Sequence, residues 1–374
     1  MKYFTLSKQQ HRSLVIVSLL SVLTVLQYLF TKSVHVHIQE EVHRTLFLQP
    51  LSSSAPCDSN YRLRCIYDSP EKSDTVLFWH VPKSGGTTAK RIYQCMGKTI
   101  ADKLGSWPQF QHHKTKELKV FKPFPHSTYK TINVDTTNLS GMLRAKEMGL
   151  ISSHTADIIF THDISAAVRH LGFDTSNQGR ALALFRDPIE RLVSKFYYLR
   201  VASWERGYRP HWNNMTGLQW AESEKSGPES NYMVQKLSGK GWDDPVTEND
   251  LPKVKQMLRD HIIVGLLSDV EESFRRFNIV MGGLTGGKKK RDNRLASRCM
   301  KKVFHPEERS INEVVEENKN VHDSILPGSP EWRVLARKNH LDVHLYSYIE
   351  TLFYEQKDIV DSYYNEPKLL TMPY

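Results

Sequence analysis

Cysteine is scarce in this chain: its 374 residues include only Cys57, Cys65, Cys95 and Cys299. None of them belongs to a C-x-x-C pair, which argues against a zinc site. Cys57 and Cys65 are close enough in the sequence to form a local disulfide loop, and Cys95 and Cys299 could form a second bridge or stay as buried thiols. Four cysteines allow three pairings, and the sequence does not choose between them.

The chain also lacks the G-x-x-x-x-G-K-[ST] loop of nucleoside triphosphatases. Here Lys83 comes before the glycine pair Gly85 and Gly86 instead of after it. A kinase or ATPase would also need an acidic residue for magnesium, and no convincing motif of that kind accompanies the loop. These absences disfavour a nucleoside-triphosphate-dependent phosphotransferase, which is kept as an alternative, and no metal ion is expected.

Acidic residues are missing from residues 1–13, which carry Lys2, Lys8 and Arg12, and residues 14–30 have no charge at all. This apolar run is about the minimum length that spans a bilayer, and the preceding basic residues favour a cytoplasmic N-terminus. No convincing cleavage site follows, so we expect an uncleaved signal anchor. The predicted order is a cytoplasmic tail (1–13), a transmembrane helix (14–30), a stem (31–73), a lumenal domain (74–360) and a C-terminal tail (361–374).

A lumenal domain is compatible with disulfides and with two N-x-[ST] sequons, at Asn138 and Asn214, which can accept glycans. The formal net charge is +10 and the pI is about 9.2. A basic balance favours an acidic partner, such as nucleic acid, an anionic membrane or an acidic glycan, although a solvated basic surface gives the same balance.

The stretch DTVLFWHVPKSGGTTAKRIY (74–93) predicts a buried strand, a tight loop and the start of a helix. An apolar run ends at Pro82, which has no N–H for a sheet ladder. The loop residues are Lys83, Ser84, Gly85, Gly86, Thr87 and Thr88. The two glycines let the backbone turn its N–H groups inward, and either threonine could cap the helix. Such a loop can bind an anion, although an ordinary strand-to-helix turn would look similar.

A second strand end has the same organisation. The strand ALALF (181–185) leads into Arg186, Asp187 and Pro188, and the amphipathic helix IERLVSKFYYLR follows. Asp187 suits the N-cap position and Pro188 the first helical position. Arg186, with Ser194 two turns into the helix, could hold a phosphate. A structural arginine and a surface serine fit the pattern equally well.

Strands alternate with helices along the chain, which predicts an α/β domain with a parallel sheet flanked by helices. Further strands are expected at 157–161, followed by His162, and at 262–267. Helices are expected from the glycine loop to about Lys103, at 231–239, 252–260 and 270–277, and within 329–354. Residues 105–135 are expected to form a loop, 203–230 a long surface insertion or a substrate-facing loop, and 282–298 a flexible and strongly basic loop.

Taken together, PKSGGTT and FRDPIERLVSKFYY resemble the two phosphate-binding motifs of sulfotransferases that use 3′-phosphoadenosine-5′-phosphosulfate (PAPS). Residues 231–239, 264–277 and 339–353 are similar to segments of Golgi membrane-bound carbohydrate sulfotransferases, notably the heparan sulfate 2-O and 6-O group. The resemblance covers roughly residues 74 to 355. It implies the P-loop-like parallel sheet of PAPS sulfotransferases behind one transmembrane helix, a single-pass type II Golgi location, and a glycan acceptor, with an acidic polysaccharide expected first and nucleic acid not expected.

The resemblance also implies roles for individual residues. An acceptor hydroxyl would attack sulfur in line, and 3′-phosphoadenosine-5′-phosphate (PAP) would leave. Lys83 would neutralise charge on the leaving oxygens while the N–H groups of residues 84–88 hold the 5′-phosphate, and Arg186 and Ser194 would hold the 3′-phosphate. Histidine is the base best matched to neutral pH. The favoured base is His162, although Asp163 follows it where many relatives have a glycine-type pattern. His154 is second, and a structural role is open for both histidines.

A third possibility is a catalytically inactive membrane protein that binds anionic glycans. The intact Lys83 and Arg186 motifs favour an enzyme, because a pure binder has no need of both. The sequence does not identify the acceptor: heparan-like, chondroitin-like and other polysaccharides remain open, as does a protein tyrosine. The position sulfated and the oligomeric state are likewise undetermined.

Overall fold

The computed structural model describes residues 57, 62–103, 115–205, 207–227, 229–284, 289–305 and 325–365. One compact unit begins at Cys57, and Leu63 and Ile66, which lie in the segment expected to be the stem, are buried in its core. The predicted anchor, 14–30, lies outside the described residues. Within the described ranges, no helix combines the length and the apolar character needed to cross a membrane.

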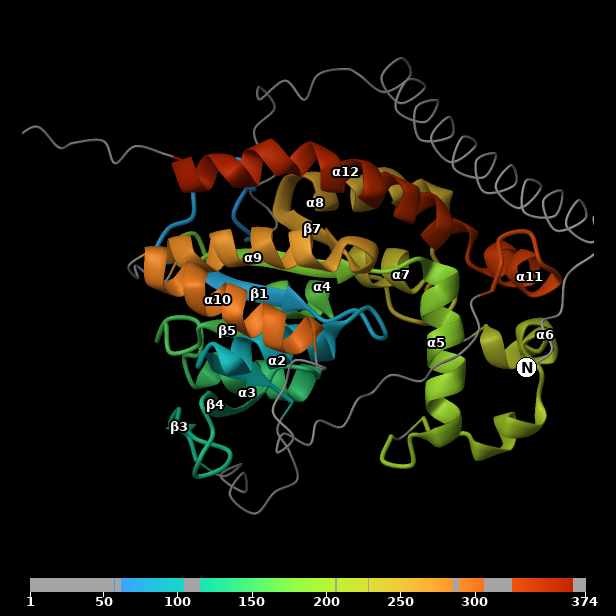
Figure 1. Cartoon of the computed structure of the whole chain (residues 1–374), viewed down its shortest axis with the longest axis horizontal. Helices are drawn as coiled ribbons and strands as arrows, with labels where there is room; N and C mark the ends of the chain where they lie inside the picture. The colour runs from blue at the N-terminus through green and yellow to red at the C-terminus, as the bar shows by residue number, and fades with distance from the viewer. Residues whose placement is uncertain are drawn as a thin grey trace, which may run out of the picture. The chain divides into compact units, whose positions relative to one another are not determined.

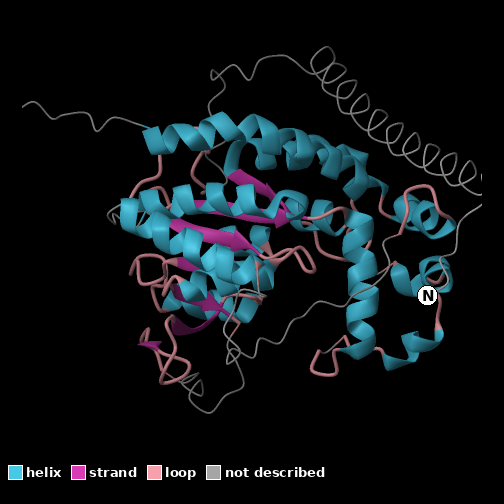
Figure 2. Cartoon of the chain, in the orientation of Figure 1, coloured by secondary structure: helices cyan, strands magenta, loops and turns pink. Residues whose placement is uncertain are grey.

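A mostly parallel sheet forms the centre of this unit (Figures 1 and 2). In the described part of the chain it has seven strands in the order β3-β4-β2-β5-β1-β6-β7. All neighbouring strands are parallel except β3 and β4. The strands are β1 (Thr75–Trp79), β2 (Thr99–Asp102), β3 (Val120–Phe121), β4 (Lys130–Asp135), β5 (Ile158–Thr161), β6 (Gly179–Phe185) and β7 (Ile262–Leu266). The α/β prediction is therefore confirmed.

Helices cover both faces of the sheet. One face packs against α2 (Gly86–Cys95) and α9 (Val270–Leu284), with α10 (Lys289–Phe304) in contact with both helices. The other face packs against α3 (Leu139–Glu147), α4 (Ile164–His170), α7 (Tyr232–Ser238) and α8 (Leu251–His261). Figure 1 shows α9 and α10 in front of the strands and the long α12 (His340–Asn365) above them.

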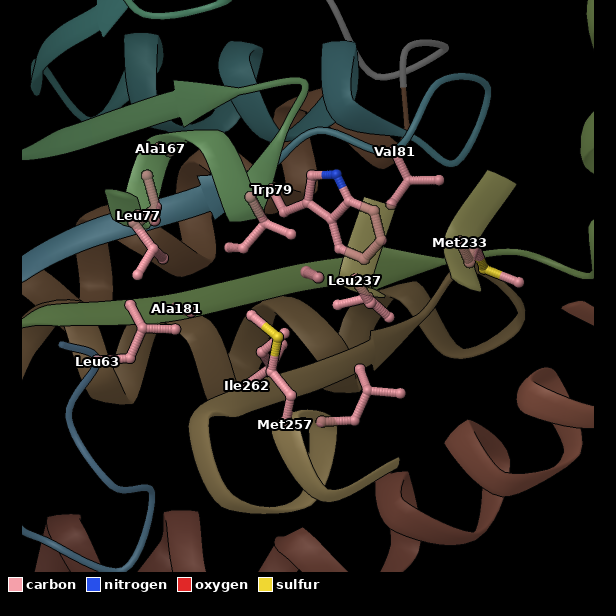
Figure 3. Close-up of a cluster of buried hydrophobic side chains, with 14 of the residues drawn as sticks. Leu63, Leu77, Trp79, Val81, Ala167, Ala181, Met233, Leu237, Met257 and Ile262 are labelled. Atoms are coloured by element: carbon pink, nitrogen blue, oxygen red, sulfur yellow. The ribbon is translucent and has the colours of Figure 1, made fainter. Parts of the chain in front are cut away.

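The side chains of β1 alternate between these two layers because successive residues of a strand point to opposite faces. Val76 and Phe78 belong to the cluster with α2 and α9, whereas Leu77 and Trp79 belong to the cluster on the opposite face. Figure 3 shows the second cluster, where Trp79 of β1 lies among side chains of α4, α7, α8 and the neighbouring strands. Burial on both faces fixes β1 in the middle of the sheet.

Helix α12 covers β7, which is the edge strand on this side of the sheet. The amide of Gln356 accepts a hydrogen bond from the backbone N–H of Val264 at 2.9 Å and donates one to the carbonyl of Ile262 at 2.9 Å. A side chain thus satisfies backbone groups that an open edge would leave unpaired.

A helical lobe is built around α5 (Pro188–Val201), which follows β6. Its other elements are η4 (Pro210–Asn214), α6 (Gly217–Glu222), η5 (Glu224–Ser226) and α11 (Pro330–Lys338). Phe196 of α5 stacks on Trp212 and Trp220, with ring centroids 5.8 and 4.7 Å apart, and both tryptophans are buried. The prediction of a surface insertion at 203–230 is therefore wrong for its core, because the aromatic side chains pack against α5. Two short helices, η6 (Glu248–Asp250) and η7 (Leu267–Asp269), flank α8 and β7.

Three other expectations are wrong. The helix after the glycine loop ends at Cys95, and residues 99–102 form β2 instead of continuing the helix to Lys103. Gly97 takes a left-handed conformation, with φ of 73°, which ends the helix and lets the chain re-enter the sheet. Residues 130–135 form β4 within the predicted loop, and much of the predicted basic loop at 282–298 is helical in α9 and α10.

Both short-range and long-range disulfides are present. Cys57 pairs with Cys65, and Cys95 at the end of α2 pairs with Cys299 of α10. No free cysteine remains. The second bridge holds α10 against the helix that starts at the glycine loop.

Candidate active site

The two strand ends singled out in the sequence lie side by side. β1 and β6 pair in parallel with Trp79 opposite Ala183, so the loops that follow them leave from the same edge of the sheet. The Arg186 guanidinium donates from Nη1 to the carbonyl of Lys83 at 3.4 Å, and its Nη2 lies 3.1 Å from Glu190 Oε2. Arg186 therefore joins the glycine loop to the start of α5.

The glycine loop ends in a helix start without a side-chain cap. Gly85 is the N-cap of α2 with φ of 87°, a conformation that favours glycine. The expected capping by Thr87 or Thr88 is wrong, because no side chain of the described residues caps this helix. The backbone N–H groups of Gly86, Thr87 and Thr88 belong to the first turn, where a helix offers no internal acceptor. Uncapped donors of this kind attract an anion.

Ser84 differs from the rest of the loop. Its backbone N–H donates to the carbonyl of Val81 at 3.2 Å, so this donor is already used. Its hydroxyl is buried and has no hydrogen-bond partner among the described residues. Of the backbone N–H groups predicted to bind an anion, at residues 84–88, only those after Ser84 are therefore available.

Lys83 is half-buried and lies against α5. Its Nζ is 4.1 Å from the centroid of the Tyr198 ring, a cation–π contact. Burial, with a further contribution from Arg186, lowers the pKa of Lys83 to about 8, while Glu205 acts in the opposite direction. The Tyr198 hydroxyl donates to Glu205 at 2.8 Å. The lysine is thus a cation in a partly desolvated site, where its charge acts more strongly on a bound anion.

One side of α5 faces the glycine loop. Asp187 caps this helix by accepting from the N–H groups of Ile189 and Glu190, as predicted. Glu190 contacts Arg186 and Tyr198 contacts Lys83. Ser194 lies one helical turn from each of these two α5 residues, and it is buried. Ser194 therefore lies on α5 between Glu190, which contacts Arg186, and Tyr198, which contacts Lys83.

His162 follows β5, the strand that pairs with β1 on the side opposite β6. It lies at the same edge of the sheet as Lys83, as the sequence predicted. Burial lowers the pKa of His162, and so do the charges of Lys90 and Lys103, while Asp102 and Asp135 act in the opposite direction. The neutral imidazole, which can accept a proton, is thereby favoured near neutral pH.

His154, the second candidate for the base, precedes β5, whereas His162 follows it. It is exposed and stands at the opposite edge of the sheet from Lys83 and Arg186. The two candidates are thus separated by the whole strand, and only His162 lies with the loop residues.

The sequence reasoning missed His80. This residue directly follows β1, and its ring contacts that of His162 edge to face, with centroids 4.9 Å apart. A Cβ added to Gly86 would lie 2.1 Å from His80 Nε2, so the imidazole rests on the first residue of α2. The rule that selected His162, a histidine at the carboxyl end of a buried strand, would have selected His80 as well.

A second missed group lies along α5. Lys195 forms an ion pair with Glu229, and Arg191, which is fully buried, lies 3.5 Å from the same carboxylate. Burial and the neighbouring Arg191 lower the pKa of Lys195 to about 8. Glu205, which acts on Lys83, acts on Lys195 too. Arg191 and Lys195, which flank Ser194 in the sequence of α5, therefore share the Glu229 carboxylate.

Alanine at Gly86 tests the packing of this edge. The added Cβ would lie 1.8 Å from His80 Cδ2, so we expect Gly86→Ala to reduce the free energy of unfolding by about 1–3 kcal/mol. This sign is informative because Gly→Ala inside a helix ordinarily stabilises by about 1 kcal/mol. Denaturant unfolding measures the change, with Gly241→Ala as the matched control, since no atom lies within 4 Å of its added Cβ. A Gly86→Ala protein as stable as the wild type would contradict this packing.

Comparison of the sequence with protein-family models and with curated proteins gave no match. In the ranges that the structure covers, no group of three or more histidine, cysteine, aspartate or glutamate side chains could hold a metal ion.

Proposed function

We propose that this chain is a sulfotransferase that moves the sulfuryl group of PAPS to a hydroxyl of a carbohydrate. The observation that carries the proposal is the junction of the two loops, in which Arg186 Nη1 donates to the Lys83 carbonyl at 3.4 Å. An uncapped helix start and a desolvated lysine thus lie next to an arginine and a buried serine. Such a pair of anion sites suits a ligand with phosphate groups at two positions.

Each residue has a defined task in this mechanism. The N–H groups of Gly86, Thr87 and Thr88 bind the 5′-phosphosulfate, and Arg186 with Ser194 binds the 3′-phosphate. The acceptor oxygen forms a bond to sulfur while the bond from sulfur to the phosphate oxygen breaks. Lys83 stabilises the charge that develops on that oxygen.

His162 takes the proton of the attacking hydroxyl. The shift of its pKa below the usual value keeps it unprotonated near neutral pH. The position of His162 after β5, at the edge shared with Lys83, supports this assignment. The leaving group is PAP, which retains both phosphates.

The finer fold assignment and the cellular location are part of the same proposal. The sheet order, with β1 between β5 and β6, supports the P-loop-like arrangement of PAPS sulfotransferases, because ligands of such sheets bind beyond the carboxyl ends of central strands. Two disulfides support an oxidising compartment such as the secretory lumen. Both sequon asparagines, Asn138 and Asn214, are exposed. A type II Golgi membrane location follows if residues 14–30 serve as the anchor.

A variant of Arg186 tests binding of the 3′-phosphate separately from binding of the 5′-phosphate. We expect Arg186→Ala to weaken PAP binding by about 10–100-fold, because a charged hydrogen bond contributes about 1.5–3 kcal/mol. Binding of adenosine 5′-phosphate, which has no 3′-phosphate, should change much less. Calorimetry on the full chain measures both affinities, and Arg333→Ala, an exposed arginine of α11, is the control. An equal loss for both nucleotides would contradict the assignment of Arg186 to the 3′-phosphate.

The acceptor class requires a direct assay. Incubating the full chain with sulfur-labelled PAPS and a panel of desulfated heparan-like, chondroitin-like and other glycans should label one class. Labelling of tyrosine peptides alone would replace the carbohydrate acceptor with a protein. Turnover of ATP that requires magnesium, without sulfuryl transfer, would instead favour a phosphotransferase.

A further inference from the structure

His80 has an unusual environment for a histidine at a strand end. Its Nδ1 is buried and finds no hydrogen-bond partner among the described residues. The opposite edge of the ring, which carries Nε2, lies on Gly86 at the uncapped start of α2. The imidazole therefore lies against the first residue of α2, beside the uncapped start of this helix.

The protonation state of His80 follows from its surroundings. Burial, the charge of Lys90 on α2 and the neighbouring His162, which follows β5, all lower the pKa of His80 well below the usual value. The ring is thus neutral at physiological pH, with one N–H donor and one acceptor nitrogen. A proton on Nδ1 would be a buried donor without an acceptor among the described residues, so we place the proton on Nε2. A neutral imidazole held this way can polarise an oxygen.

We propose that His80 is a second catalytic histidine, which donates its Nε2 hydrogen to an oxygen of the sulfuryl group during transfer. This role rests on the proposed function. The His80 and His162 rings are in edge-to-face contact, and the proposal gives each histidine a separate role. His162 accepts the proton of the attacking hydroxyl, while His80 remains neutral and stabilises the group that is being transferred.

Two amide substitutions distinguish the roles of the two ring nitrogens. Glutamine can place an amide donor near the position of Nε2, and asparagine near that of Nδ1. We expect His80→Asn to lower kcat about 10²-fold, as the loss of one preorganised donor does, and His80→Gln to stay within about 10-fold of the wild type. PAP has no sulfuryl group, so its affinity should be unchanged in both variants.

Equal activity of the two variants, or weaker PAP binding in either, would overturn the proposal. The acid limb of the pH–rate profile gives an independent readout. The acid limb should remain in His80→Gln, because His162 is the proposed base. Loss of the acid limb in this variant would identify His80 as the base and overturn the proposed roles of the two histidines. If wild-type protein neither binds PAP nor transfers sulfate, the proposed function itself fails and the His80 role falls with it.

NMR of isotope-labelled histidine in the wild-type full chain tests the assignment without any variant. We expect His80 to show the neutral Nε2–H tautomer throughout the titration of His162. A cationic ring at about pH 6, or a proton on Nδ1, would overturn the proposal.

Discussion

Replacing Lys83 with alanine should lower kcat for sulfuryl transfer by about 10³-fold, because removing one preorganised charge from a developing oxyanion has an effect of this size. The fold should persist. The lysine contributes a half-buried side chain that contacts the Tyr198 ring, and alanine meets the same backbone requirement of positive φ, 64° here. Steady-state kinetics and thermal unfolding on the same preparation measure both effects.

The pH profile adds a second signature of Lys83. Only the protonated amine can stabilise the leaving oxygen, and its pKa in the free protein is about 8. We therefore expect kcat/KM to fall as pH rises through about 8 in the wild type, and this limb to vanish in Lys83→Ala. Lys72→Ala is the matched control, because this exposed lysine precedes β1 at the opposite end of the strand. Activity of Lys83→Ala within 10-fold of the control would contradict its role.

Replacing His162 with alanine should lower kcat by about 10³-fold, within the range of general base catalysis. The proposed base acts when it is neutral, and the pKa of His162 lies below the usual value because of burial and Lys90. The wild-type kcat/KM should therefore fall as pH decreases through that lowered pKa, whereas His162→Ala should lose this acid limb. A pH–rate series on both proteins measures the difference.

His154→Ala is the control for this experiment, since His154 stands at the other end of β5 and is exposed. It should keep wild-type activity and the acid limb. The opposite pattern, with an inactive His154→Ala and an active His162→Ala, would contradict the placement of the base.

The sequence predicted the parts of the fold that depend on local patterns. β1, β5, β6 and β7 are short apolar runs bounded by polar or turn residues, and such runs can be read without knowledge of their partners. The strands β2 and β4 escaped prediction because they are less apolar. β4 (KTINVD) has lysine and aspartate at its ends, and its position depends on pairing with β2. Tertiary pairing, not propensity, places these strands in the sheet.

The candidate site was predictable to the extent that it follows one rule. Residues after parallel strands gather at one edge, and that rule brings Lys83, Arg186 and His162 together. It should also have yielded His80. The cations on α5 could not be read in the same way, because the partner of Lys195, Glu229, comes from a segment that appeared in the sequence to be a surface insertion.

The charge of the basic segment near residue 290 misled the secondary-structure prediction. The run KKKRDNR suggested a loop, but α10 is amphipathic, and Ala296 and Cys299 are buried on one side. The disulfide from Cys299 to Cys95 and the packing against α2 and α9 stabilise the helix. Pairing of these cysteines, which the sequence left open, was the missing information.

Transfer of label from PAPS to a glycan is the most direct measurement of the central claim. The full chain, its Lys83→Ala variant and the Lys72→Ala control are incubated with sulfur-labelled PAPS, mixed desulfated glycans and a metal chelator. The proposal predicts labelled glycan with the wild type and the control, and almost none with Lys83→Ala. Wild-type protein that binds PAP and glycan but labels no acceptor would contradict the account and leave a binding protein in its place.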